Sequence, residues 1–231
     1  MVGLIPLFAV EIIEPEILEK LPHFKLRLKW FLNYRPALAG LVSFGDVPGH
    51  GKRRLLSLLR GHRMKKILQR MLDESEFLSA YGVRSLSRTH LDEPYIFECD
   101  GNSVAVQYQP GESESFLFGG NSNWQGHVWF PVNYLIITSL RRFATYYGDD
   151  FKIECPTGSG NFLTITEVAD ELTTRLTKLF RRDKAGKEQY LATMRGYKRI
   201  LISRITSCFM SIFTVITAGE LVLPIRLGGP G

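Results

Sequence analysis

The 231 residues are 45% hydrophobic and 23% charged, which suffices for a globular core and excludes a wholly disordered chain. The net charge of +6 is uneven, because the stretch Lys52–Arg70 holds eight Lys or Arg residues and no acid. We interpret this stretch as a solvated helix face rather than a nucleic-acid or membrane-binding patch. The scattered Cys99, Cys155 and Cys208 favour neither a disulfide scaffold nor a zinc site, and they indicate a cytoplasmic location.

The N-terminal half predicts helices separated by proline and glycine. The apolar start at Met1 predicts the beginning of a buried helix. Apolar residues then recur every three or four positions from Leu18 to Phe31, which predicts a helix that ends before Pro36. After a loop over residues 40–51, the same spacing predicts a helix over Leu55–Leu72.

The second half predicts a long loop between further helices. Residues 74–120 are rich in Gly, Ser, Pro and aromatic residues, which predicts a long irregular insertion with one small β-hairpin near Val104–Tyr108. Helices are expected over Trp129–Tyr147 and Val168–Arg181, the latter capped by Thr164 or Thr166. Helices without alternating strands predict an all-α protein and exclude a doubly wound α/β sheet.

Several motifs carry no functional prediction. The stretch from Gly45 to Arg53 has the composition of a phosphate loop, but its glycine spacing is one residue too long and Arg53 replaces the hydroxyl residue that holds magnesium. The five histidines lack metal-ligand spacing, and no Ser stands in a G-x-S-x-G elbow. We therefore expect no metal and no cofactor.

The segment over residues 108–135 has the composition of a carbohydrate site. It joins two tryptophans, amides and Glu112 on a glycine-rich loop. Flat rings stack on the apolar face of a pyranose, and amides and carboxylates bind its hydroxyls. Composition alone leaves open a structural role for the tryptophans as anchors of a helix start.

Asn123-Trp124-Gln125-Gly126-His127-Val128-Trp129, followed by Asn133-Tyr134-Leu135, resembles the W-R-G-P-(I/V)-W…N-Y-L signature of glycoside hydrolase family 63. Flanking stretches from Met1 to about Lys187 resemble a glucosidase-like branch of that family. The resemblance implies a carbohydrate ligand, an (α/α)6 toroid, and an inverting mechanism on α-glycosidic bonds of glucosides or mannosides. It implies these sugar-contact residues: Glu112, Asn123, Trp124, Gln125, Trp129 and Asn133.

The chain departs from the family pattern at the catalytic positions. The aspartate that acts as general acid is expected upstream of Met1, and the F-Y-E-Y-like segment that supplies the basic glutamate does not occur, so no catalytic residue is assigned. Gln125 and His127 stand where the family usually has Arg and Pro. The resemblance therefore implies a partial toroid, an incomplete six-hairpin barrel that does not catalyse alone.

A frameshift near Lys187 is our hypothesis for the unusual C-terminus. Regrouping plausible codons of the tail restores F-Y-E-Y-like and G-W-T segments, which divides the chain into a hydrolase-like domain over residues 1–187 and an aberrant apolar tail over 188–231. Residues 205–219 are apolar but shorter than the ~20 residues of a membrane span. The alternatives are a non-catalytic carbohydrate-binding module, or a membrane-associated fragment that uses Lys52–Arg70 and this tail.

Overall fold

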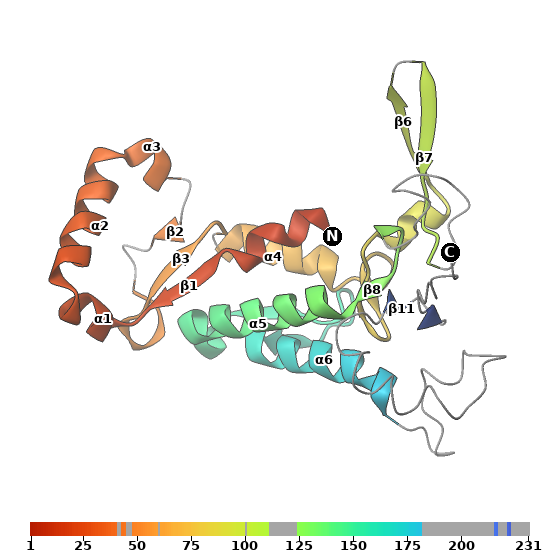
Figure 1. Cartoon of the computed structure of the whole chain (residues 1–231). Coiled ribbons are helices and arrows are strands. Elements are labelled where there is room, and N and C mark those ends of the chain that lie inside the picture. Colours follow the sequence, from red (N-terminus) through yellow and green to blue (C-terminus); the bar gives the residue numbers. More distant parts are fainter. Residues whose placement is uncertain are drawn as a thin grey trace, which may run out of the picture. The chain divides into compact units, whose positions relative to one another are not determined.

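The computed structural model of the chain describes residues 1–40, 43–44, 48–59, 61–99, 101–110, 124–181, 215–216 and 221–222. The chain divides into two compact units. The first unit comprises Met1–Asp73 and Leu135–Glu171, and the second comprises Glu74–Tyr134 and Leu172–Gly231. Helices α5 (Phe130–Tyr147) and α6 (Ile165–Thr177) each contribute residues to both units (Figure 1).

An antiparallel sheet with the order β1-β3-β2 organises the start of the first unit. The central strand β3 pairs Leu55 with Ile12 of β1, and burial alternates along it. The expected N-terminal helix is a 3-10 helix in which only Leu4 and Leu7 are buried. The bounds are Val2–Phe8 for η1, Val10–Ile13 for β1, Ser43–Phe44 for β2, His50–Lys52 for η2 and Arg54–Ser57 for β3.

The helix expected over Leu55–Leu72 is wrong in its first part. Residues up to Ser57 form β3, because their alternating burial fits pairing with the apolar strand β1. Helix α4 (Gly61–Met71) forms the remainder and buries Met64, Leu68 and Met71. Its Lys and Arg side chains at positions 63, 65, 66 and 70 are exposed, as a solvated face requires.

Three successive helices follow β1, and none of them buries a side chain. The helical pattern around Leu18–Phe31 is confirmed, but Pro22 divides it, since proline is well suited to a first helical turn. Exposed apolar side chains include Leu26 and Trp30, the latter 54% exposed. The bounds are Pro15–Lys20 for α1, Pro22–Tyr34 for α2 and Pro36–Ala39 for α3 (Figure 1).

The core of the first unit is formed by the apolar faces of α4, α5 and α6. The expected helix over Trp129–Tyr147 is confirmed as α5, whose Ile136, Leu140 and Phe143 are fully buried.

Surface ion pairs join Arg53 to Glu14 at 2.8 Å and Arg142 to Glu11. The 3-10 helix η6 (Gly148–Asp150) and an antiparallel hairpin of β9 (Lys152–Glu154) and β10 (Phe162–Thr164) connect α5 to α6.

A capping box starts α6. The Glu167 carboxylate accepts hydrogen bonds from the Thr164 amide at 2.7 Å and the Thr164 hydroxyl at 2.9 Å. The Thr164 hydroxyl in turn accepts from the Glu167 amide at 3.3 Å. Of the two caps considered, Thr164 is therefore the one used, and α6 begins three residues before the expected Val168. The 3-10 helix η7 (Lys178–Phe180) continues from its C-terminus.

The second unit consists of small hairpins and the ends of α5 and α6. Hairpins form between β4 and β5 and between β6 and β7, so the region 74–110 holds more than the one hairpin expected. Strand β8 pairs with β11, which also pairs with β12. The bounds are Leu78–Ser79 for β4, Gly82–Val83 for β5, Arg88–Leu91 for η3, Tyr95–Cys99 for β6, Asn102–Val106 for β7, Val128–Trp129 for β8, Val215–Ile216 for β11 and Leu221–Val222 for β12.

The mostly helical class is confirmed, since the longest described elements are helices and the strands are short and form small sheets. The (α/α)6 toroid stays a prediction. None of the helices in the described part of the chain is long and apolar enough to cross a membrane. Most of the apolar tail over residues 205–219 lies outside the described residues.

Candidate functional site

An aromatic pair marks the predicted sugar segment in the second unit. The ring centroids of Trp124 and Trp129 are 5.7 Å apart with an interplanar angle of 31°. Trp124 is 46% exposed, and Trp129 is half-buried in strand β8. A large aromatic ring open to solvent beside a second ring can receive the flat apolar face of a ligand.

The backbone around this pair is fixed by the chain that follows β5. The Gly126 amide donates to Ser85 Oγ at 2.9 Å, and the Ser85 amide donates to the His127 carbonyl at 2.8 Å. The Gln109 amide donates to the Gln125 carbonyl at 2.7 Å. These bonds join three segments distant in sequence, so the backbone of residues 125–127, directly after Trp124, is anchored.

Glycine is required at position 126. Its φ of +129° disfavours any side chain, and a Cβ there would lie 2.4 Å from the Tyr108 ring. Tyr108 is buried and packs directly over this backbone. The glycine of the signature therefore serves close packing between the tryptophan loop and Tyr108.

Asn133 is committed to the protein backbone. Its Oδ1 accepts from the Val83 amide at 2.7 Å, and its Nδ2 donates to the carbonyls of Val83 at 3.1 Å and Trp129 at 2.8 Å. The side chain is 1% exposed, and Gly82 gives it room to approach β5. Asn133 thus holds the first turn of α5 against the β4–β5 hairpin.

The predicted sugar-contact residues fall into three groups. Trp124 and Trp129 lie together with an exposed ring surface. Gln125 and Asn133 are in the same segment, but each is only 1% exposed. Glu112 and Asn123 lie outside the described residues.

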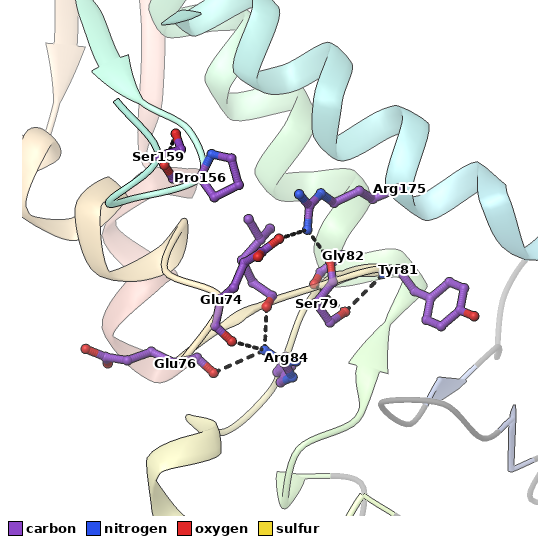
Figure 2. Close-up of polar contacts among 10 residues, drawn as sticks. Glu74, Glu76, Ser79, Tyr81, Gly82, Arg84, Pro156, Ser159 and Arg175 are labelled. Atoms are coloured by element: carbon purple, nitrogen blue, oxygen red, sulfur yellow. Dashed lines mark hydrogen bonds and ion pairs between the residues drawn. The ribbon is translucent and has the colours of Figure 1, made fainter. Parts of the chain in front are cut away.

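A buried polar cluster beside this segment was not predicted. Arg175 Nη1 donates to Glu74 Oε1 and to the Ser79 carbonyl, both at 2.9 Å (Figure 2). Arg84 Nη1 donates to the carbonyls of Glu74 at 3.3 Å, Glu76 at 3.4 Å and Leu78 (Figure 2). A signal existed for Arg175, because it falls on the buried apolar stripe of α6 three positions after Leu172.

Burial of the charged Arg84 guanidinium costs free energy. Burial lowers the pKa of Arg84, whereas the nearby Tyr108 raises it and Arg88 lowers it further. Arg84 is buried with its charge, so the three carbonyls that it binds offset only part of the loss of water. Within the described residues, no group of three or more His, Cys, Asp or Glu side chains could hold a metal ion.

Comparison with known proteins identifies the family of this chain. A model described as the mannosylglycerate hydrolase MGH1-like glycoside hydrolase domain matches residues 55–204, more than half of the chain. The chain belongs to this glycoside hydrolase family. The matched residues include Trp124, Trp129, Asn133 and the Arg84–Arg175 cluster.

A relative in yeast is similar over most of the chain. The uncharacterized protein YMR196W of Saccharomyces cerevisiae is 49% identical over 187 residues, which cover 80% of this chain and 17% of the yeast protein. The chain therefore spans less than a fifth of the length of this relative. No solved structure matches the chain.

Proposed function

We propose that this chain is the sugar-contacting part of an inverting glycoside hydrolase of the family 63 type, built on an (α/α)6 scaffold, and that it does not hydrolyse glycosides by itself. The substrates of the intact enzyme are α-glucosides or α-mannosides. The residues proposed to contact the sugar are Glu112, Asn123, Trp124, Gln125, Trp129 and Asn133. The membership of the chain in a glycoside hydrolase family supports this proposal.

One observation carries the proposal, namely the exposed ring of Trp124 beside Trp129. An exposed aromatic ring beside a second ring offers a flat apolar surface, and the apolar face of a pyranose is a partner of matching size. The backbone directly after Trp124 is anchored through Gln125 and Gly126, which limits the backbone ordering that a ligand would have to induce there.

Sugar binding can be tested by tryptophan fluorescence. Methyl α-glucoside and methyl α-mannoside are titrated into the chain and into Trp124→Ala, with Trp30→Ala as the control because Trp30 is similarly exposed but lies in the first unit. We expect a saturable signal that Trp124→Ala abolishes and Trp30→Ala retains. A signal that survives Trp124→Ala would contradict the proposed site.

The proposed inactivity of the isolated chain has a different basis. An inverting glycosidase needs two carboxyl groups about 6.5–9.5 Å apart on opposite sides of the scissile bond. The positions that the family resemblance assigns to them have no counterpart in this chain. We expect no turnover of aryl α-glucosides or α-mannosides above background, and clear turnover would show that other carboxylates act.

The frameshift near Lys187 is proposed as the origin of the tail. It predicts that a one-base change in the gene restores a segment with the missing glutamate, which would straddle Met210 and Ser211. Reading the nucleotides on both sides of codon 187 tests this. If no one-base change restores that segment, the tail is an authentic part of the protein.

A further inference from the structure

A cavity with surplus positive charge lies in the second unit, apart from the tryptophan pair. Its volume is about 370 Å³, and it is formed by the β4–β5 hairpin, the end of α6 and the residues that follow them. Its charged lining residues are Glu74, Arg84, Arg88, Arg175 and Lys178. Four cations face one carboxylate, which leaves a formal surplus of three positive charges.

The carboxylate in this cavity is already engaged. Glu74 Oε1 accepts from Arg175 Nη1 at 2.9 Å, and the same nitrogen also reaches the Ser79 carbonyl (Figure 2). Arg175 is buried, whereas the Glu74 side chain is largely exposed. The single acid therefore pairs directly with Arg175 and acts on Arg84 at longer range, and its one negative charge does not balance the four cations of the cavity lining.

Arg84 is a buried cation whose neighbours are mostly uncharged. Its Nη1 binds three main-chain carbonyls, whereas its buried Nε makes no close hydrogen bond in the described part of the chain. The buried Tyr108 hydroxyl lies beside Arg84 and raises the pKa of Arg84 through its charge and a side-chain hydrogen bond, so this contact is weak rather than absent. A buried cation in this state costs free energy that a nearby anion would recover.

The two remaining cations are placed to attract such an anion. Arg88 begins η3 and Lys178 begins η7, and both side chains are exposed at the cavity. Neither makes an ion pair with a carboxylate of the described residues. Exposed flexible cations at the mouth of a cavity with a buried guanidinium inside are the arrangement that phosphate recognition uses.

We propose that this cavity binds a phosphate group, independently of the sugar site. A phosphate monoester carries about −1.5 to −2 charges at pH 7 and offers three acceptor oxygens, which match the surplus charge better than a single carboxylate does. Arg84 is held by its carbonyl contacts and forms the inner side of the site. Arg88 and Lys178 lie on its solvent side. Inorganic phosphate and a small phosphate monoester share this chemistry.

The test is calorimetric titration of the full chain with inorganic phosphate at constant ionic strength. We expect saturable binding by the wild-type chain. The double variant Arg88→Gln/Lys178→Gln should bind at least about tenfold more weakly, because it loses two charge-assisted contacts while its exposed positions leave the fold intact. The matched control is Arg63→Gln/Lys66→Gln, which removes the same two charges from the exposed face of α4 in the first unit.

The outcomes are distinct. Retained affinity in the control together with loss in the Arg88/Lys178 variant supports the site. Equal loss in both double variants shows a nonspecific charge effect and overturns the proposal, as does the absence of phosphate binding by the wild-type chain.

Glycerol phosphate distinguishes the two sources of the phosphate group. Tighter binding than inorganic phosphate identifies an organic monoester, and weaker binding identifies the free ion. Methyl α-glucoside should leave phosphate affinity unchanged, so failure here is separate from failure of the sugar proposal.

Discussion

The Asn133 side chain uses its amide group in hydrogen bonds to the protein backbone. All three of its described bonds go to the backbone of Val83 and Trp129. A side chain used in this way sets where the tryptophan segment lies relative to β5. Its presence in the family signature is thus explained by architecture, and its proposed contact with sugar would have to be made in addition.

Substitution Asn133→Ala should destabilise the chain by about 2–3 kcal/mol, because the buried amide and carbonyl of Val83 lose their partners. Urea unfolding followed by circular dichroism measures this. Asn33→Ala is the control, since Asn33 is exposed in α2 and alanine suits a helix. Equal effects at both positions would contradict the role of Asn133.

Substitution Gly126→Ala should cost about 3 kcal/mol, since the new methyl group would meet the Tyr108 ring and the backbone has a positive φ. Gly101→Ala separates the two causes. Gly101 has a φ of +76° but no heavy atom within 4 Å of an added Cβ, so only about 1 kcal/mol is expected there. Thermal unfolding of both variants measures the difference, and similar losses would argue against the contact with Tyr108.

Helix α6 is the element whose start is best defined. Its capping box joins Thr164 and Glu167 reciprocally. Thr164→Ala should lower stability by about 1 kcal/mol, because the Glu167 amide loses its capping acceptor and the Glu167 carboxylate loses the hydroxyl donor. Thr166→Ala lies two residues inside the start and should change little. A larger loss at Thr166 in chemical denaturation would mean that the helix begins elsewhere.

The same box predicts a pH dependence. Hydrogen bonds from the backbone and side chain of Thr164 lower the pKa of Glu167. A lowered pKa in the folded state stabilises the fold at pH values above the ordinary carboxyl pKa of about 4.3, and this contribution disappears as pH falls through the folded value. The stability difference between wild type and Glu167→Gln should therefore shrink on acidification.

Glu16→Gln is the control for this pH dependence, because Glu16 also lies in the first turn of a helix but makes no capping hydrogen bond in the described structure. Unfolding free energies of the three chains between about pH 7 and pH 3 provide the comparison. A gap for Glu167→Gln that stays constant across this range would exclude the carboxylate as its cause.

At the scale of the whole molecule, burial is unevenly distributed. Helices α1, α2 and α3 bury no side chain, whereas α5 carries fully buried Ile136, Leu140 and Phe143. Amides of α2 should therefore exchange hydrogen about a hundredfold faster than those in the middle of α5. Exchange followed by mass spectrometry measures both helices in one sample. Equal protection would show that α2 is covered in solution, for instance by self-association.

The sequence predicted the long helices well and the short strands poorly. Helix α5 carries a sustained apolar stripe, so its periodicity was sufficient, whereas the sequence left the cap of α6 open between Thr164 and Thr166 and the structure decides for Thr164. Strand β3 was missed because Leu55 and its neighbours are apolar at spacings that both a helix and a paired strand allow. Its identity depends on β1, a partner more than 40 residues away.

The residue types of the candidate site could be predicted from the sequence, but the contacts that each residue makes could not. The sugar contact of Trp124 and Trp129 stays a prediction, and nothing in the spacing of Asn133 shows that its amide bonds to Val83. Arg84 gave no periodic signal, since it directly follows the two-residue strand β5 and its guanidinium binds carbonyls rather than side chains. Charge buried by backbone contacts is visible only once the chain is folded.

The close approach of Trp124 and Trp129 has an optical consequence. Two indoles whose centroids are 5.7 Å apart and whose planes differ by 31° share their electronic excitations, whereas Trp30 is stacked on Tyr34 instead. Such a coupled pair produces circular dichroism bands of opposite sign that vanish when either ring is removed. The circular dichroism of this pair therefore reports the relative orientation of the two rings. It responds to a change in ring orientation even with ligands that do not alter fluorescence.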